Sequence, residues 1–362
     1  MTGRTFIIAE AGVNHNGSLA RALKMVRLAA AAGADAVKFQ SFITELQVTR
    51  AAPKAQYQRR NTGSGGSQFK MLKKLELSFT DQRKLMVACR RAGIEFMSTP
   101  FDPTSARFLI KARAVKRLKV ASGEITNAPL LLDMARSRKP IVLSTGMSNL
   151  DDVRRALGVI AFGSVAAKTA APSARTFAKA LASSRGREPV RRRVTILQCT
   201  TAYPAPADSI NLAAMTTLAN TFGVRVGLSD HSRGIAVAAA AVARGATVIE
   251  KHFTLDRKLP GPDHKASLTP DELREIVAAI RTVEQAIGRA DKRLVAAETG
   301  VRDVARKSLV ALRPVKKGER FTARNLGAKR PGGGVSPMDY WSYLGRRAKR
   351  AYAADQLIAD KP

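Results

Sequence analysis

The sequence predicts a (β/α)8 barrel, the TIM-barrel class of α/β fold, followed by a small β-rich domain. Eight short apolar runs of the kind that form buried parallel strands occur within residues 1–288, and helical patterns separate them. Eight strand–helix pairs match a barrel better than an open sheet. No Gly-x-Gly-x-x-Gly motif follows the first strand, which argues against a dinucleotide-binding fold.

The elements of the barrel follow one another in a regular order. We expect strands at 5–11, 36–41, 95–99, 117–122, 141–145, 194–200, 225–229 and 247–252. Apolar residues at helical spacing predict helices at 19–32, 80–92, 150–160, 235–244 and 269–287. The last helix opens with Thr269 as N-cap and Pro270 at the first helical position, which is a favourable helix start.

Two stretches interrupt this order. Residues 51–69 are polar and glycine-rich, which predicts a long mobile loop after the second strand. Residues 162–193 are rich in Ala, Ser, Lys and Arg and lie between the fifth helix and the sixth strand. We interpret this basic insertion as a solvated segment with some helix, on the face away from a barrel's active site. An interaction segment is the alternative.

The chain divides into a catalytic barrel at 1–288, a charged linker at 289–304 and a small domain at 305–362. The small domain has strand-like pieces at 308–312 and 315–319 and a basic, glycine-rich run at 329–334. A core of this size is marginal alone, so we expect the domain to lean on the barrel or on a partner subunit.

The composition limits the functional classes. With 62 Lys and Arg against 28 Asp and Glu, the formal charge is +34, which favours anionic ligands. The basic residues are scattered, aromatic residues make up 5%, and no nucleic-acid-binding motif is present, so we expect no specific nucleic-acid binding. Two cysteines make no disulfide framework, and no apolar run reaches the roughly 20 residues of a membrane span. We therefore expect a cytoplasmic protein without a membrane segment.

Polar side chains follow the predicted strands where a barrel carries its active site, at the carboxyl ends. All four histidines fall there, and His231 and His252 belong to the last two strands. Two imidazoles with open positions suit a divalent metal; Mn(II) is favoured, and Co(II) or Zn(II) would also fit. Glu10 could complete the site. The strand-end groups are Glu10, Lys38, Gln40, Thr99, Lys119, Ser122, Glu124, Ser144, Thr201, Tyr203, Ser229, His231 and His252.

Lys38 and Lys119 lie within apolar strands, where an unpaired ammonium group is costly. An anion must accompany them, and nearby serine hydroxyls suggest a site for phosphate and carboxylate. Two alternatives remain open. A Schiff-base aldolase would use either lysine as nucleophile but would leave the histidines unexplained. In a purely structural role, Glu10 or Glu124 would neutralise a lysine.

Nine ordered stretches of the chain resemble the sialic acid synthase family over almost its whole length. They are IIAE at 7–10, NHNG at 14–17, AAGADAVKFQ at 31–40, STPFD at 98–102, KVASGEITN at 119–127, LSTGM at 143–147, GLSDHS at 227–232, EKHF at 250–253 and GPDHKAS at 261–267. The C-terminal part is similar to the family's antifreeze-protein-like (SAF) domain, and Lys329-Arg330-Pro331-Gly332 matches its sugar-reaching loop.

The resemblance implies a synthase that condenses phosphoenolpyruvate with an open-chain N-acetylated hexose and releases phosphate. It implies a homodimer with a domain-swapped C-terminal domain, in which Arg330 crosses to the partner's sugar. It assigns a divalent metal, with Mn(II) favoured over Mg, Co or Zn, to His231 and His252. It assigns the phosphoenolpyruvate contacts to Lys38, Thr99, Lys119, Ser122, Ser144 and Ser229. It places Glu10, Tyr203 and Asp263 near the metal or the sugar, and it makes Glu124 a catalytic carboxylate.

The sugar is the least defined part of this interpretation. We expect N-acetylmannosamine as substrate and N-acetylneuraminate as product, with legionaminic acid synthesis from 2,4-diacetamido-2,4,6-trideoxymannose as the alternative. Thr201, where many relatives have Asn or Ser, and Gln198, where His is frequent, leave the sugar open. From another functional class, the rival is a basic nucleic-acid-associated protein that uses a barrel as scaffold.

Overall fold

The structure is a computed structural model that describes residues 3–63 and 65–359. The chain forms two compact units, residues 1–288 and 289–362. Ser64, within the polar stretch at 51–69, lies outside the described residues. So do residues 1–2 of the expected barrel domain and residues 360–362 of the expected small domain.

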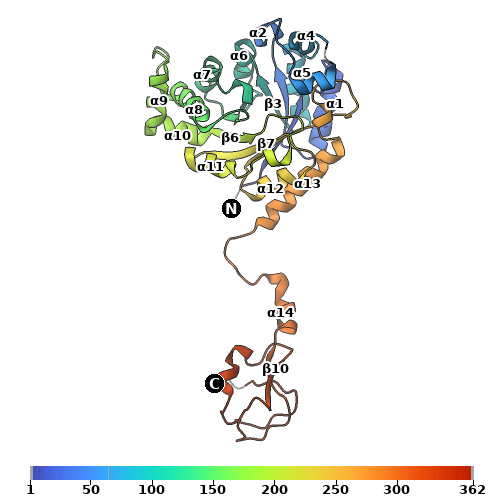
Figure 1. Cartoon of the computed structure of the whole chain (residues 1–362), viewed down its shortest axis with the longest axis vertical. Coiled ribbons are helices and arrows are strands. Elements are labelled where there is room, and N and C mark those ends of the chain that lie inside the picture. Colours follow the sequence, from blue (N-terminus) through green and yellow to red (C-terminus); the bar gives the residue numbers. More distant parts are fainter. Residues whose placement is uncertain (1–2, 64, 360–362) are drawn as a thin grey trace. The chain divides into compact units, whose positions relative to one another are not determined.

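The first unit is an eight-stranded parallel barrel, as predicted (Figure 1). Its strands join in the order β3-β2-β1-β8-β7-β6-β5-β4, so every neighbouring pair except β3 and β4 is hydrogen-bonded. The barrel is therefore nearly closed. The strands are β1 (Phe6–Gly12), β2 (Ala36–Ser41), β3 (Glu95–Pro100), β4 (Leu118–Val120), β5 (Ile141–Ser144), β6 (Val194–Cys199), β7 (Arg225–Asp230) and β8 (Val248–His252).

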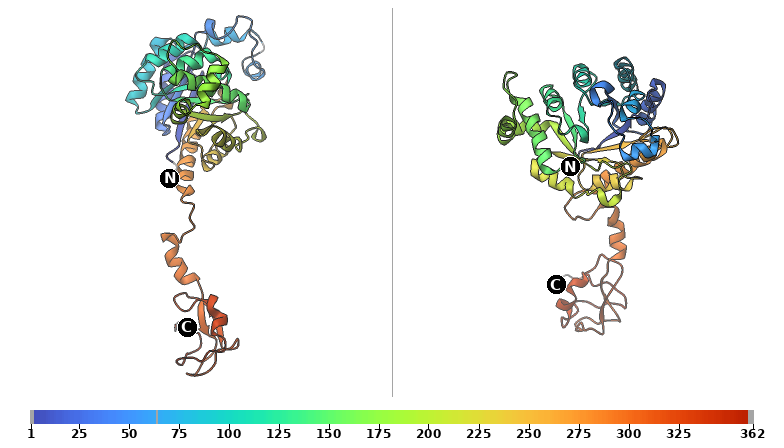
Figure 2. Two further views of the ribbon diagram at one scale, coloured as in Figure 1. Left: turned by 90° about the vertical axis from the view of Figure 1, so that its left-hand side faces the viewer. Right: turned by 45° about the horizontal axis from the view of Figure 1, so that its top comes forward.

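Helices surround the strands, as the two views of Figure 2 show. Each principal helix turns apolar residues toward the sheet and begins at a side-chain cap where the sequence offers one. In α13, Thr269 accepts a hydrogen bond from the backbone of Glu272, which completes the predicted helix start. The helices are α1 (Leu19–Ala31), α5 (Phe79–Arg91), α6 (Pro103–Lys111), α7 (Ala128–Arg136), α8 (Leu150–Val165), α11 (Ala214–Phe222), α12 (Ala236–Ala243) and α13 (Pro270–Ile287), with 3-10 turns η1 (Ser122–Glu124), η2 (Ala207–Ser209) and η3 (His264–Ala266).

The prediction of a mobile loop at 51–69 is wrong. The chain between β2 and α5 folds into three short helices, α2 (Thr44–Gln47), α3 (Gln56–Thr62) and α4 (Gln68–Lys73). The buried ammonium group of Lys54 donates to the carbonyl oxygens of Gly63 and Gly65, at 3.1 and 2.8 Å. Polar composition suggested a loop, but the Lys54 ammonium group and the caps of the short helices satisfy much of the backbone of this segment.

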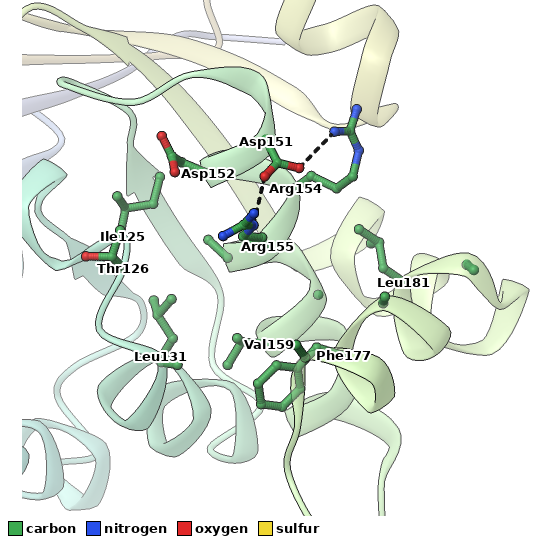
Figure 3. Close-up of a pocket in the computed structure, with 16 residues that line it drawn as sticks. Ile125, Thr126, Leu131, Asp151, Asp152, Arg154, Arg155, Val159, Phe177 and Leu181 are labelled. Atoms are coloured by element: carbon green, nitrogen blue, oxygen red, sulfur yellow. Dashed lines mark hydrogen bonds and ion pairs between the residues drawn. The ribbon is translucent and has the colours of Figure 1, made fainter.

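The basic insertion is largely helical. Its first residues still belong to α8, and the rest forms α9 (Ala174–Ala182) and α10 (Ser184–Arg193), which pack against α8 outside the barrel. A mainly apolar groove of about 860 Å³ lies between α7, α8 and α9. Figure 3 shows the residues that line it. Phe177 of α9 lies near Val159, and Asp151 pairs with Arg154 and Arg155 at one end. No predicted catalytic residue lines this groove.

The second unit has its own small core. A linker-like start carries η4 (Ala296–Glu298) and α14 (Thr299–Ala305), and β9 (Ser308–Ala311) pairs antiparallel with β10 (Leu326–Lys329). η5 (Pro337–Asp339) and α15 (Tyr340–Tyr343) follow. The core residues include Leu309, Val315, Phe321, Leu326, Tyr343, Tyr352 and Ile358.

Two further predictions concern the whole chain. Cys89 and Cys199 are both buried and free, so neither forms a disulfide bond. Within residues 3–63 and 65–359, no helix combines the length and the apolar character needed to cross a membrane.

Candidate active site

A cavity of about 270 Å³ opens at the carboxyl ends of the barrel strands. It collects most of the side chains that the sequence nominated, although they come from eight different strand ends. Parallel strands bring their carboxyl ends to one rim, which explains the convergence. The predicted residues that line it are Glu10, Lys38, Gln40, Thr99, Lys119, Ser122, Ser144, Thr201, Tyr203, Ser229, His231, His252 and Asp263.

Strand register places the charged groups at one level. Glu10 of β1 lies opposite Lys38 of β2 on one side and His252 of β8 on the other. Gly12, two residues beyond Glu10, has a φ of +51°, and a Cβ there would come within 3.2 Å of a Glu10 oxygen and 3.6 Å of the His252 ring. The positive φ favours glycine at this position, and a side chain there would also press on Glu10.

A buried network of two lysines and two glutamates forms the floor of the cavity. Lys38 Nζ lies 2.8 Å from Glu10 Oε2 and 3.7 Å from Glu250 Oε2. Lys119 Nζ lies 3.8 Å from the other Glu250 oxygen. All four side chains are at most 5% exposed. Glu250 therefore lies between the two cations and compensates part of their desolvation cost.

These contacts shift the pKa values of the four groups. Burial, opposed by Lys38 and assisted by Glu250, raises the pKa of Glu10 to about 7. Burial opposes ionisation of Lys38, but the charges of Glu10 and Glu250 outweigh it and raise the pKa of the amine. Burial lowers the pKa of Lys119. Burial disfavours ionised Glu250 as well, but the attraction of Lys119 and Lys38 prevails and lowers its pKa.

Hydroxyl groups extend the network toward the cavity. Lys38 donates to Thr99 Oγ1 at 2.9 Å, and Lys119 donates to Ser144 Oγ at 2.8 Å. Ser229 donates to Glu250 at 3.1 Å. Ser122 Oγ accepts a hydrogen bond of 3.0 Å from the backbone of Gly146. Two ammonium groups and several hydroxyls facing one small cavity are suited to an anion with several oxygens.

The two histidines lie beside this cluster. The ring centroids of His231 and His252 are 5.3 Å apart. His231 Nδ1 lies 2.8 Å from the carbonyl oxygen of Thr200, which can only accept, so Nδ1 carries the proton. Burial and the neighbouring His231 lower the pKa of His252 well below its usual value, which keeps that ring neutral. Neutral imidazole is the form that binds metals.

Tyr203 and Asp263 complete the histidine side of the cavity. The ring of Tyr203 lies 4.2 Å from that of His231 and meets the His252 ring edge-on at 5.6 Å. Burial, opposed by His231, raises the pKa of Asp263 to about 6. The Asp263 Oδ1 atom is buried and has no hydrogen-bond partner in the protein.

This donor set fits a divalent cation bound in part by substrate or water. His252 Nδ1 and Asp263 Oδ1 are both buried without a partner, and the His231 tautomer leaves Nε2 free. In the part of the chain that the structure describes, no three His, Cys, Asp or Glu side chains are grouped as a metal site. Two histidines would leave the remaining coordination positions of a bound cation to substrate or water.

The other two histidines, His15 and His264, lie in the loops after β1 and β8, but they do not line the cavity. His15 Nδ1 accepts a hydrogen bond from the backbone of Gly17 at 3.0 Å. His264 contacts Thr254 Oγ1 at 2.6 Å and Asn16 Oδ1 at 3.1 Å. Burial lowers the pKa of each ring to about 4. Both are neutral side chains: His15 braces its own loop after β1, and His264 joins that loop to the one after β8.

Two predicted residues do not line the cavity in the barrel unit. Glu124, in η1, is half-buried and accepts a hydrogen bond of 2.7 Å from Asn127 Nδ2. Arg330 belongs to the second unit, where it is exposed and directly follows β10.

Several lining residues escaped the sequence analysis. Glu250 is two positions before His252, so alternation along β8 could have placed both side chains on the inner face. Tyr57 stacks on Tyr203 with ring centroids 4.8 Å apart, and Gln47 and Gln58 line the cavity nearby. Tyr57 and Gln58 belong to α3, within the stretch predicted as a loop, and Gln47 belongs to α2, just before that stretch; the sequence carried no signal for the site at any of the three.

Together, the barrel and the polar cavity at the carboxyl ends of its strands have the arrangement of a TIM-barrel enzyme, with groups suited to an anion on one side and two histidines on the other. The chain belongs to the NeuB family, whose model matches residues 25–292, and a SAF domain matches residues 306–361. The members of this family are phosphoenolpyruvate-dependent condensing enzymes. Family membership therefore identifies a phosphoenolpyruvate-dependent synthase. It excludes the two alternatives of the sequence analysis, the Schiff-base aldolase and the basic nucleic-acid-associated barrel.

Curated relatives extend over nearly the whole chain. The N,N'-diacetyllegionaminic acid synthase of Campylobacter jejuni subsp. jejuni serotype O:2 is 44% identical over 357 residues, which cover 99% of each chain. The enzyme of the same name from Legionella pneumophila subsp. pneumophila is 43% identical and covers 98% of this chain and 93% of its own. Human N-acetylneuraminate-9-phosphate synthase is 32% identical, with coverages of 98% and 92%.

A solved structure shares the fold. The N-acetylneuraminic acid (sialic acid) synthetase from Leptospira borgpetersenii serovar Hardjo-bovis, crystallised with citrate, superposes with a TM-score of 0.66. It is 29% identical and covers 83% of this chain and 90% of its own. The comparisons thus define a nonulosonic acid synthase.

Proposed function

We propose that this enzyme condenses phosphoenolpyruvate with 2,4-diacetamido-2,4,6-trideoxymannose to give N,N'-diacetyllegionaminate and phosphate. The observation that carries the proposal is identity of 44% and 43%, over almost the full length, to two synthases of that name. The expected N-acetylneuraminate product is less well supported, since the human N-acetylneuraminate-9-phosphate synthase is 32% identical. The alternative product of the sequence analysis is therefore preferred.

Phosphoenolpyruvate would bind over the two lysines. Lys38 and Lys119 supply the positive charge, while Thr99, Ser122, Ser144 and Ser229 supply hydroxyl groups for the phosphate and carboxylate oxygens. Glu250 holds both ammonium groups in place before the substrate arrives. Pre-positioned cations need no rearrangement when the phosphate departs, which lowers the barrier to its release.

The sugar aldehyde would lie beside His231 and His252. A divalent cation held by these histidines, with Mn(II) favoured, would polarise the aldehyde toward attack by C3 of phosphoenolpyruvate. The Thr200 carbonyl fixes the His231 ring in the tautomer that this role requires. The Tyr203 ring packs beside the His231 ring at a centroid distance of 4.2 Å and supports its position.

Carbon–carbon bond formation leaves positive charge at C2 of the former phosphoenolpyruvate. Glu10 and Glu250 lie in the same cavity and can stabilise that charge. A water molecule then adds at C2 and loses a proton, and the resulting tetrahedral intermediate breaks its C2–O bond to phosphate and forms the C2 carbonyl. The former aldehyde oxygen takes up a proton and becomes a hydroxyl group. Glu10, with its pKa near 7, is suited to take the proton of the water at neutral pH, whereas Glu124 is turned toward Asn127.

The second unit would contribute from a partner subunit. By the family resemblance, Arg330 of one chain reaches the N-acetyl group of the sugar in the other chain of a homodimer. Its exposed position after β10 leaves the guanidinium group available. Two inactive variants, His231→Ala and Arg330→Ala, should then restore activity when they are mixed as subunits, because one mixed site is intact. Absence of any recovery in verified heterodimers would contradict the swap.

The central experiment is a phosphate-release assay with phosphoenolpyruvate and Mn(II). It runs 2,4-diacetamido-2,4,6-trideoxymannose and N-acetylmannosamine in parallel, with the product identified by mass. We expect a higher kcat/KM for the diacetamido sugar. A preference for N-acetylmannosamine would overturn the proposed product, and no release with either sugar would overturn the proposed reaction.

A further inference from the structure

One wall of the cavity has no assigned partner in the reaction. We call it the distal wall. It comes entirely from the three short helices after β2, and its members are Gln47, Tyr57, Gln58, Gln68, Met71 and Leu72. The lysines and serines serve phosphoenolpyruvate, and the histidines serve the aldehyde end of the sugar. The far end of the sugar therefore has the distal wall as its main remaining surface.

The distal wall is held firmly against the rest of the site. Tyr57 stacks on Tyr203, and Asn61 Nδ2 donates to the carbonyl oxygen of Pro262 at 2.6 Å. Pro262 directly precedes Asp263, so this hydrogen bond ties α3 to the loop that carries the buried carboxyl group. A wall fixed in this way can distinguish substituents by contact, because its side chains do not simply move aside.

The wall presents unused amide groups. Gln47 Oε1 is buried and accepts no hydrogen bond from the protein, which is costly unless a ligand donates to it. Gln58 is 8% exposed; its Oε1 accepts from the Ala55 backbone at 2.9 Å, while its Nε2 has only a 3.4 Å contact with the Tyr57 hydroxyl. The wall therefore offers two groups to a ligand: Gln47 Oε1 as a free hydrogen-bond acceptor, and Gln58 Nε2 as a donor with only one weak contact.

Beside these amides the wall is apolar. Leu72 belongs to a buried cluster with Val13, Phe42 and Leu75, and Met71 packs against that cluster. Val13, Met71 and Leu72 also face the cavity. A methyl group would be accommodated here, whereas a hydroxyl group would lose its hydrogen bonds to water.

We propose that the distal wall selects the sugar: Gln47 forms a hydrogen bond with the acetamido group at C4, and Met71 contacts the methyl group at C6. This inference rests on the proposed function and deepens it. The diacetamido sugar differs from N-acetylmannosamine at these two carbons, which carry hydroxyl groups in the latter. An acetamido group has one N–H donor and one carbonyl acceptor, and the Gln47 and Gln58 amides offer the complementary atoms. The C6 methyl group matches Met71 and Leu72.

The test compares both sugars in Gln47→Leu, which keeps the bulk of the side chain and removes its amide. We expect kcat/KM for the diacetamido sugar to fall about tenfold or more, mainly through KM, with a smaller loss for N-acetylmannosamine. The KM for phosphoenolpyruvate should stay within about threefold of wild type. Gln56→Leu is the matched control, because Gln56 lies on α3 one residue before Tyr57 but is exposed outside the cavity.

A second variant tests the apolar part without removing bulk. Met71→Gln places an amide against the C6 position and should lower the preference for the 6-deoxy sugar, whereas Met71→Leu should preserve it. The wild-type preference tests the proposed function, and the variants test the wall. If wild type prefers the diacetamido sugar and both Gln47→Leu and Met71→Gln keep that preference unchanged, the distal wall does not select the sugar. If wild type prefers N-acetylmannosamine, the proposed substrate and this inference both fail.

Discussion

The His231 ring donates a 2.8 Å hydrogen bond from Nδ1 to the backbone carbonyl oxygen of Thr200. This contact fixes the tautomer and leaves the Nε2 lone pair free. The carbonyl belongs to the residue that follows β6, so the barrel itself orients the ring. The contact therefore orients the His231 ring beside His252, whose lowered pKa keeps it neutral, and the pair is arranged for metal binding.

Replacing His231 by alanine should therefore abolish metal-dependent turnover. We expect phosphate release to fall by about a thousandfold or more at saturating Mn(II), which corresponds to several kcal/mol of transition-state stabilisation. Calorimetric titration should show weakened Mn(II) binding. His264→Gln is the control, because His264 bonds only to neighbouring loops and should affect stability more than metal affinity. Full activity of His231→Ala in metal-supplemented buffer would rule out the assignment.

Much of the barrel could be predicted because strand and helix periodicities are local properties of the sequence. All eight strands occur where expected, although β4 is only three residues long, since the chain turns into η1 at Ser122. Most of the rim could also be predicted, because a polar residue that ends an apolar strand has few places to point other than into the cavity.

The residues that escaped prediction depend on long-range contacts. Tyr57 reaches the site only because Lys54 and Asn61 anchor the segment around α3, and polar composition alone indicated a loop. His15 and His264 follow strands at the same rim as the proposed metal histidines. Their hydrogen bonds, however, are to residues of the loops, so they do not face the cavity. The roles of the two lysines depend on Glu250. Its position between them follows from the register of the barrel strands, which a sequence motif does not reveal.

Glu250→Gln should destabilise the ligand-free protein. The variant leaves two buried ammonium groups with less compensation, and breaking a buried ion pair costs about 3 kcal/mol or more. Urea unfolding measures the loss. Saturating phosphoenolpyruvate should recover part of it, since the substrate's own negative charges replace the carboxylate. An equal loss with and without phosphoenolpyruvate would show that the substrate does not bind over these lysines.

The pKa of Glu10 predicts a specific pH dependence of stability. The folded protein holds this proton up to about pH 7, whereas the unfolded chain releases it near 4.5. Folding therefore binds a proton in this window, and the contribution of Glu10 to the free energy of unfolding falls as pH rises from 4.5 to 7. The shift corresponds to roughly 3 kcal/mol.

Urea unfolding of metal-free wild type and Glu10→Gln, at several pH values across that window, isolates this contribution. His15 and His264, with pKa values lowered to about 4, act in the opposite direction but are present in both proteins and cancel in the difference. Relative to wild type, Glu10→Gln should gain stability as pH rises. A difference that does not change with pH would show that Glu10 titrates as an ordinary carboxyl group.

Gly146→Ala should damage the site without unfolding the barrel. A Cβ at this position would come within 2.1 Å of Thr201 Oγ1 and 2.8 Å of Ser122 Oγ, so both cavity-lining hydroxyls must move. A displacement of about 1 Å can cost on the order of a hundredfold in rate, and we expect kcat/KM for phosphoenolpyruvate to fall by that amount. Steady-state kinetics with thermal unfolding measures both effects. Gly300→Ala, where a Cβ meets nothing within 4 Å, is the control and should keep wild-type kinetics. Unchanged kinetics in Gly146→Ala would mean that neither hydroxyl contacts the substrate.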